Sequence, residues 1–408
     1  MHGFDIKLIN YLRKNLYVLA YALLTGIALL IRISDLEFQS LDYRNFLGPW
    51  MQELEQAGIR GVGCVGDYNV PYTIVLAVIA YLPFDKLTMV KLVSILFDFV
   101  GAAGAAMIVF YLLPEQKRKT GAFICYGAML LIPAFILNSS YWAQCDSIYV
   151  SILLFSILAF MKERYRRSFI LLAAAYCLKQ QTVFILPAFA VYYMICKKYS
   201  ILNFLWIPAM YIGSVMPAIL MGNSPFHVLS IYMRQVFYYR ELTLGYPNLY
   251  ALIPGDYGSF AGFAFFLAVG ILFAGAVVWV IRKQSFKAAE FLELVIWCGM
   301  VCVLFLPAMH ERYGYIIEAA AIIYAVIDHR KWWLAAALNL TALIAYSPYL
   351  FQEVIIDIKY MAIVNIVIFL IYTITIFRGR EYELSGISQH RCGDQEDNKS
   401  GQPDGKDN

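Results

Sequence analysis

The feature that most constrains the fold of this chain is a series of apolar runs that could each cross a lipid bilayer. A membrane-spanning helix needs about 20 mostly apolar residues, because each residue rises about 1.5 Å through a hydrocarbon core about 30 Å thick. Hydrophobic residues make up 61% of the 408 residues and charged residues only 15%, against about a quarter in soluble domains. The sequence therefore predicts an all-α polytopic membrane protein. Runs that meet or approach the required length lie at 16–33, 88–113, 121–137, 147–161, 201–221, 260–281, 290–309, 332–350 and 360–377.

Three further segments are apolar but short or interrupted, and their interpretation decides the topology. They are 70–84, 169–196, which is interrupted by a polar stretch at 179–181, and 314–327. If the first is an interfacial or re-entrant helix and the second a helical hairpin, every strongly basic short loop falls on the side of the basic N-terminus. Lys and Arg accumulate in cytoplasmic loops. We therefore expect about 12 spans, with both termini in the cytoplasm of a cell-membrane protein.

The chain divides into a transmembrane domain, 1–377, and a polar tail, 378–408. The tail is poor in hydrophobic residues, so we expect it to be disordered and cytoplasmic. Within the transmembrane domain, the longest external loop is 34–87, which combines carboxylates and aromatic residues with segments that have the spacing of interfacial helices. A polar loop of this length indicates a site that faces the external side of the membrane.

Several classes of function are disfavoured by what the sequence lacks. The phosphate-binding motif GxxxxGK[ST] does not occur, which argues against ATP hydrolysis. The predicted cytoplasmic loops are too short to hold a nucleotide-sugar domain. A net charge of +4 gives no reason to expect nucleic acid as a partner.

Six motifs that follow one another between about residues 30 and 325 resemble those of one family. One span followed by a long acidic external loop and about ten further spans is similar to the GT-C superfamily of membrane glycosyltransferases. More closely, the motifs resemble bacterial membrane proteins related to GPI mannosyltransferase II. They read LDYRNFLGPW, GDYNVPY, NSSYWAQCDSIYVS, LKQQTVFILP, YPNLYAL and MHERYGY.

The resemblance implies a GT-C type helical bundle with interfacial helices in its first external loop. It also implies transfer of a hexose, plausibly mannose, from a polyprenyl-phosphate donor to an extracytoplasmic glycan or lipid-linked acceptor. Transfer would invert the configuration at the anomeric carbon, and the active site would lie on the extracytoplasmic face. Membrane lipids and the two saccharide substrates are the expected partners.

Inverting transfer needs a carboxylate that takes the proton of the acceptor hydroxyl as the new bond forms. The resemblance places Asp42, in LDYRNF, at the position of this catalytic base. Asp35, Glu37 and Asp146 are competing candidates. Alternatively, Asp42 caps a helix expected at 43–58, since aspartate is a common first residue before a helix.

The first external loop also offers Tyr43, Asp67 and Tyr68 as substrate-binding residues. Tyr43 lies on the expected interfacial helix, whose more ordinary role is to rest on the bilayer surface. Asp67 and Tyr68 precede Val70-Pro71, so Asp67 either lines a cavity or serves the turn that leads into the next segment.

Two further external segments are expected to bind the substrate. YWAQCDS supplies Gln144 and Asp146, and an acid at membrane depth is costly unless it faces a polar cavity. Asp146 could instead cap the span that begins at Ser147. LKQQ places Lys179 and Gln180 at the tip of a hairpin, where an ammonium group can pair with a lipid phosphate. The alternative for Lys179 is a snorkelling lysine that marks a helix end.

The last candidate segment is a short turn with four adjacent polar residues, His310, Glu311, Arg312 and Tyr313. Arg312 can bind a phosphate with two hydrogen bonds, and His310 can donate to it or orient the leaving group. Solubility of the turn is the alternative explanation. No second histidine follows at the spacing of a zinc motif, so we do not expect zinc, but the sequence leaves open a divalent cation as cofactor.

Two other functions compete with glycosyl transfer. A transporter or flippase of lipid-linked saccharides would need charges at mid-bilayer and broken helices in both halves of an inverted repeat. In this sequence the polar groups fall on one face, and one broken segment stands out, which favours the transferase. A non-catalytic membrane protein of envelope assembly is the third alternative.

Overall fold

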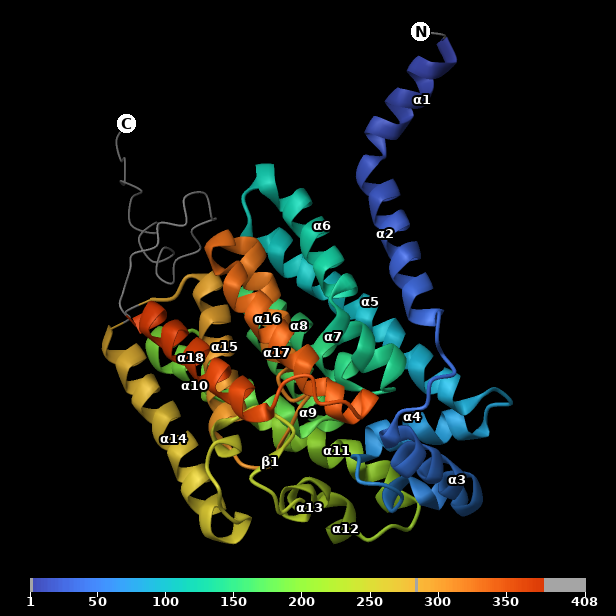
Figure 1. Cartoon of the computed structure of the whole chain (residues 1–408), viewed down its shortest axis with the longest axis vertical. Coiled ribbons are helices and arrows are strands. Elements are labelled where there is room, and N and C mark those ends of the chain that lie inside the picture. The colour runs from blue at the N-terminus through green and yellow to red at the C-terminus, as the bar shows by residue number, and fades with distance from the viewer. Residues whose placement is uncertain (1–2, 283–284, 378–408) are drawn as a thin grey trace, which may run out of the picture.

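The computed structural model describes residues 3–282 and 285–377, and over these residues the protein is a bundle of helices (Figure 1). Two strands of two residues each, β1 (Thr243–Leu244) and β2 (Met309–His310), are present beside the helices. The predicted all-α membrane fold is thus confirmed. The tail 378–408 lies outside the described residues, so the expectation of a disordered tail stays a prediction.

Seven helical segments in the described part of the chain are long and apolar enough to cross a membrane. An eighth candidate consists of α6 (Glu115–Leu131) followed by α7 (Pro133–Ile136) and the π-turn η3 (Leu137–Tyr141), with a bend of 54°. The bend falls at Pro133, because proline lacks a backbone N–H and disfavours helical conformation at the residue before it. The seven segments are α2 (Leu16–Ile33), α5 (Lys86–Leu112), η5 (Ile201–Leu205) with α11 (Trp206–Leu220), α14 (Tyr257–Arg282), α15 (Ala288–Phe305), η7 (His329–Lys331) with α17 (Trp332–Phe351), and α18 (Ile358–Phe377).

The remaining expected spans are shorter helices, so the number of about 12 spans stays a prediction. The expected hairpin at 169–196 is present as two helices joined by a 3-10 turn at the predicted polar stretch. The shorter helices are α8 (Asp146–Met161), α9 (Tyr165–Leu178), η4 (Gln180–Ile185) with α10 (Leu186–Cys196), and α16 (Tyr315–Ile327).

Polar and apolar side chains are distributed as a membrane protein requires. Val18 on α2 and Phe266 on α14 are 68% and 74% exposed, and their helices present further apolar side chains to the outside. By contrast, Arg32, Lys91 and Asp98 are buried inside the bundle. Large exposed apolar faces are rare on soluble proteins, whereas a bilayer covers them. The centre of the bundle is formed by α15 and α16, whose side chains are almost all buried.

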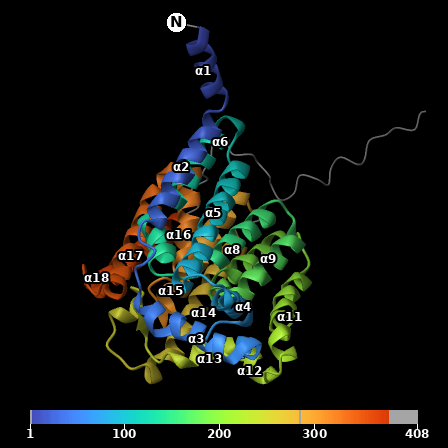
Figure 2. The same cartoon turned by 90° about the vertical axis from the view of Figure 1, so that its right-hand side faces the viewer.

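The long connections gather at one end of the bundle, opposite α1 (Gly3–Lys14) and the start of the chain (Figures 1 and 2). The first loop contributes the expected short helices. The connection between α11 and α14 contributes two more helices and β1, which pairs in parallel with β2 and so joins this connection to the turn that follows α15. The elements at this end are η1 (Tyr43–Leu47), α3 (Gly48–Ala57), η2 (Gly58–Gly63), α4 (Val70–Tyr81), α12 (Pro225–Leu229), α13 (Ile231–Tyr238) and η6 (Leu249–Ala251).

Candidate functional site

Asp42 lies just before η1, and its carboxylate accepts hydrogen bonds from three side chains that are distant in sequence. Trp142 Nε1 and Gln144 Nε2 donate to Oδ2 at 2.7 and 2.6 Å, and the Tyr349 hydroxyl donates to Oδ1 at 2.7 Å. Trp142 also stacks on Tyr349, with ring centroids 5.3 Å apart. The side chain of Asp42 remains 13% exposed. A carboxylate held this firmly has a fixed orientation and is still partly accessible.

The alternative role of Asp42 as a helix cap is not seen. Its side chain makes no capping hydrogen bond, and the Tyr43 backbone N–H instead donates to Ser40 Oγ at 3.2 Å. The same Ser40 hydroxyl donates to the Trp142 carbonyl at 2.9 Å, which joins the two segments that meet at Asp42. The competing acids Asp35 and Glu37 are exposed at the surface.

Asp146 begins α8 and forms a second buried carboxylate beside the first. Lys179 Nζ donates to its Oδ1 and Asn138 Nδ2 donates to its Oδ2 at 3.0 Å, and the residue at the N-cap position of α8 is Cys145 and not Asp146. The side chains of Asp146 and Lys179 are 0% and 7% exposed. Lys179 therefore does not snorkel to a surface, but forms an ion pair inside the protein.

Arg312 lies between the two carboxylates. Its Nη1 is 3.8 Å from Asp42 Oδ2, and its Nε is 3.6 Å from Asp146 Oδ2. Its firmest contact is a hydrogen bond from Nη1 to Glu311 Oε1 at 3.0 Å, and its buried Nε has no hydrogen-bond partner. The guanidinium is thus attracted to three acids but keeps capacity to donate to a further anion.

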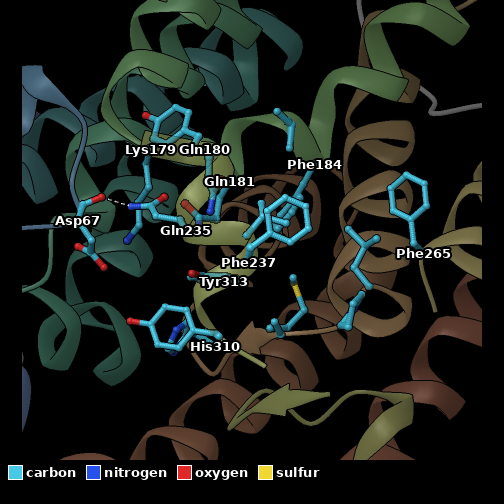
Figure 3. Close-up of a pocket in the computed structure, with 18 of the residues that line it drawn as sticks. Asp67, Lys179, Gln180, Gln181, Phe184, Gln235, Phe237, Phe265, His310 and Tyr313 are labelled. Atoms are coloured by element: carbon cyan, nitrogen blue, oxygen red, sulfur yellow. Dashed lines mark hydrogen bonds between the residues drawn. The ribbon is translucent and has the colours of Figure 1, made fainter. Parts of the chain in front are cut away.

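A cavity of about 660 Å³ adjoins this cluster. Asp67, Lys179 and Gln235 lie towards one end, whereas Phe184 and Phe265 lie at the other (Figure 3). Arg312, Gln180 and His310 belong to the polar part of the lining, together with Tyr68 and Tyr313. The apolar wall comes from η4, α13 and α14, and several of its side chains are also exposed on the outside of the bundle, including Phe237 at 64% and Phe265 at 53%. The cavity therefore leads from a charged end to the lipid-facing surface.

Burial changes the acid–base properties of the turn that carries Arg312. Burial, together with the nearby Arg312 and Lys179 cations, lowers the pKa of His310 to about 2, so the imidazole is neutral. Burial raises the pKa of Glu311 to about 7, against the opposing effect of Arg312. Burial also raises the pKa of Asp67, with Arg312 opposing the shift. The Glu311 carboxyl group can therefore change charge near neutral pH.

No protein-family model matches the chain, and no curated protein matches it. Among solved structures, ArnT from Cupriavidus metallidurans, bound to undecaprenyl phosphate, has a similar fold. The TM-score is 0.53 and the sequence identity 12%, over 88% of this chain and 76% of the ArnT chain. ArnT is a GT-C family glycosyltransferase. The chain has a GT-C fold.

The GT-C fold brings together most of the residues that the sequence indicated. Asp42, Gln144, Asp146, Glu311 and Arg312 form one hydrogen-bonded or ion-paired cluster with Lys179. Asp67, Tyr68, Gln180, His310 and Tyr313 line the adjoining cavity. Tyr43 is the exception, because its side chain packs against the apolar cluster of α3 and α4 and is not part of the cavity lining. The specific likeness to GPI mannosyltransferase II proteins stays a prediction.

Four residues of the site were not singled out from the sequence. Asn138 and Trp142 fall within a quoted motif, where their polar side chains beside an acid were an available signal. Gln235 lines the cavity, and its side chain donates to the Asp67 carbonyl. Tyr349 lies near the end of an apolar run and reaches Asp42 across 307 positions of sequence, for which no local pattern gives a signal.

The GT-C fold of this chain does not gather a set of metal ligands within the residues that the structure describes. No three His, Cys, Asp or Glu side chains in 3–282 and 285–377 are placed to share one ion. The oxygens of Asp42 and Asp146 instead accept hydrogen bonds from amide, indole, hydroxyl and ammonium groups.

Proposed function

We propose that this protein is a membrane glycosyltransferase that moves a hexose, plausibly mannose, from a polyprenyl-phosphate donor to an extracytoplasmic glycan or lipid-linked acceptor. The observation that carries the proposal is the cavity that joins two cations to a lipid-exposed apolar wall. A polyprenyl-phosphate sugar has the same polarity, with one anionic group and one long hydrocarbon chain. The ArnT structure of similar fold contains undecaprenyl phosphate, a lipid of this kind.

The donor phosphate would bind at the polar end of the cavity, between Lys179 and Arg312. Both side chains line the cavity, and the unpartnered Nε of Arg312 can donate to a phosphate oxygen. Charge-assisted hydrogen bonds to phosphate are among the stronger ones in proteins. The polyprenyl chain would follow the apolar side chains of η4, α13 and α14 towards the bilayer. His310 is neutral, so it would contribute a hydrogen bond and not a charge.

Asp42 would act as the base. Each carboxylate oxygen has about two acceptor positions, and Oδ2 already accepts from Trp142 and Gln144, whereas Oδ1 accepts from Tyr349 alone. One position on Oδ1 therefore remains for the hydroxyl of an acceptor. The oxygen of the acceptor hydroxyl attacks the anomeric carbon while the hydroxyl proton passes to Asp42. The bond between the anomeric carbon and the phosphate oxygen breaks, and its electron pair stays on the phosphate. The released phosphate dianion would be stabilised by Lys179 and Arg312.

The orientation in the membrane is part of the proposal. Basic loops are expected on the side of the N-terminus, whereas α13, which contributes to the cavity lining, lies at the opposite end of the bundle (Figure 1). By the positive-inside rule this supports cytoplasmic termini and an extracytoplasmic site. A donor flipped to the outer leaflet could then enter the cavity sideways from the lipid.

A transfer assay tests the proposal. The purified protein in lipid nanodiscs is given a panel of polyprenyl-phosphate hexoses and candidate acceptors, with and without EDTA, and products are identified by mass spectrometry. We expect one hexose to be transferred, with release of polyprenyl phosphate. In sealed vesicles, movement of a labelled saccharide lipid across the membrane without a covalent product would contradict transfer and support a flippase.

A further inference from the structure

One face of α5 carries three residues that are buried and hydrogen-bonded to other segments. Lys91, Ser94 and Asp98 are spaced by three and four positions, which places them on one side of a helix. Lys91 and Ser94 are 0% exposed and Asp98 is 6% exposed. The described residues that line the 660 Å³ cavity do not include any of these three. Burying charged side chains such as Lys91 and Asp98 inside a membrane protein is costly, so their position needs an explanation.

Asp98 is bonded to each of the three segments that meet at the candidate site. Its Oδ2 accepts from Arg32 Nε at 2.7 Å, at the end of α2, and from Ser139 Oγ at 2.5 Å, three residues before Trp142. Its Oδ1 accepts from the Tyr315 hydroxyl at 3.5 Å, three residues after Arg312. One buried carboxylate is therefore connected to the segments that carry Asp42, its donors and the guanidinium.

The Lys91 side chain and the Ser94 backbone carbonyl bond to two of these segments, whereas the Ser94 hydroxyl has no hydrogen-bond partner. All three hydrogens of the Lys91 ammonium are used, by the carbonyls of Asp35, Leu36 and Phe38 at 3.3, 2.9 and 2.8 Å. This is the stretch that leads to Asp42. The Ser94 carbonyl accepts from Ser147 Oγ at 2.8 Å, next to Asp146.

We propose that this polar face of α5 positions the reacting groups of the site, with Asp98 as its main contact. The inference rests on the proposed function, because it assigns Asp98, Lys91 and Arg32 to the geometry of the Asp42–Arg312–Asp146 cluster. Asp98 is a positioning residue, since it is buried and contacts the site through Arg32, Ser139 and Tyr315. A displacement of about 1 Å in a reacting group can lower turnover by about 100-fold, so such supports matter for rate.

A simple structural ion pair is the competing explanation for Arg32 and Asp98, and two variants separate the two. Ser139→Ala removes one bond to Asp98 and leaves the ion pair intact. Arg32→Met combined with Asp98→Leu removes both charges together, which avoids an unpaired buried charge that would prevent folding. Ser151→Ala is the control, because Ser151 is also buried but its hydroxyl donates to the Ile148 carbonyl within its own helix.

The experiment measures kcat, the affinity for a polyprenyl-phosphate hexose, thermal stability and amide hydrogen exchange for each variant in nanodiscs. Positioning predicts that Ser139→Ala lowers kcat by about 10- to 100-fold while donor affinity changes less than about twofold. It also predicts faster exchange confined to 137–147, and in the double variant to 35–44 and 310–315 as well. Ser151→Ala should match the wild type in every measurement.

Two results would overturn the inference. One is a folded double variant with wild-type kcat and unchanged exchange in all three segments. The other is a parallel loss of affinity, kcat and thermal stability, which would show a structural ion pair only. If the wild-type protein transfers no sugar, the proposed function fails, and hydrogen exchange still decides whether Asp98 holds the three segments.

Discussion

At the scale of single residues, the surroundings of Asp42 determine what its carboxylate can do. Trp142 and Gln144 occupy one oxygen, Tyr349 occupies part of the other, and Arg312 provides a nearby positive charge. The sequence indicated Asp42 and Gln144 because both lie in recognisable polar motifs. It could not indicate Tyr349, because a tyrosine at the end of an apolar run is equally typical of a membrane interface.

Removing the indole N–H from Trp142 should slow turnover. In Trp142→Phe, Asp42 loses a charge-assisted hydrogen bond of about 1.5–3 kcal/mol while most of the buried ring remains. We expect kcat to fall by about 10-fold, with donor affinity nearly unchanged. Trp50→Phe is the matched control, since Trp50 makes ring contacts with Phe46 and Tyr68 outside the Asp42 cluster. Equal kcat values for the two variants would contradict the role of the N–H group.

Donor affinity should fall as pH rises through about 7. Burial raises the pKa of Glu311 to about 7, so Glu311 is neutral below this pH and anionic above it. The anion competes with the donor phosphate for Arg312, whose Nη1 is 3.0 Å from Glu311 Oε1. The free energy of unfolding should also fall as pH rises. A carboxyl group whose pKa is raised on folding contributes stability below its unfolded pKa of about 4.5, and this contribution is lost as pH rises to about 7.

Titration of affinity with a polyprenyl-phosphate sugar tests this dependence, because its phosphodiester keeps one charge across pH 5.5–8.5. We expect the affinity of Glu311→Gln to vary much less with pH over the same range. A wild-type affinity that is constant across pH 7, or a Glu311→Gln variant that keeps the full dependence, would show that Glu311 does not control donor binding.

At the scale of elements, the positions of breaks in the apolar runs were predictable to different degrees. LKQQ indicated the hairpin, and the structure has η4 at this place between α9 and α10. The run at 121–137 was expected to be one span, but it bends by 54° between α6 and α7. Pro133 was the available signal. The pairing of β1 with β2 had no signal, because two-residue strands lack a periodic pattern and their register depends on tertiary contacts.

A methyl group added next to the strand pair, in Gly245→Ala, should weaken donor binding, whereas the same change at another glycine should not. Gly245 follows β1 with φ of +91°, and a Cβ atom there would lie 2.6 Å from Glu311 Oε2. In Gly245→Ala we expect backbone strain of about 1–3 kcal/mol and displacement of Glu311, hence a lower melting temperature and weaker donor binding. Gly222→Ala is the control, since Gly222 has φ of +95° but no atom within 4 Å of the added Cβ. Loss of donor binding in both variants would show that strain alone is responsible.

At the scale of the whole molecule, the bundle exposes apolar side chains on its outside and buries charged ones, as a membrane protein does, and a charged cluster lies at one end. The sequence predicted the fold class well, because spans of apolar residues and basic loops are strong local signals. The shape of the cavity was not predictable, since it depends on how η4, α13 and α14 pack around the turn after α15. These contacts join residues more than a hundred positions apart, such as Phe184 and Tyr313.

The orientation can be measured through Cys64, an exposed cysteine in the first loop. In a Cys392→Ser background, an impermeant maleimide should label Cys64 in intact cells, because this loop lies at the external end in the proposed topology. Lys117→Cys, placed in an exposed position at the start of α6 and combined with Cys64→Ser, should react only after permeabilisation. The reverse pattern of labelling would place the site on the cytoplasmic side.

The measurement that tests the central claim most directly compares hexose transfer by the wild-type protein and by Asp42→Asn, with donor binding measured on the same preparations. Asparagine keeps the shape of the side chain but cannot take a proton. We expect kcat to fall by at least about 100-fold, by the usual contribution of a general base, while the donor still binds. Asp35→Asn and Glu37→Gln should retain wild-type rates, as their side chains are exposed away from the cluster. Full transfer activity in a folded, donor-binding Asp42→Asn protein would contradict the account.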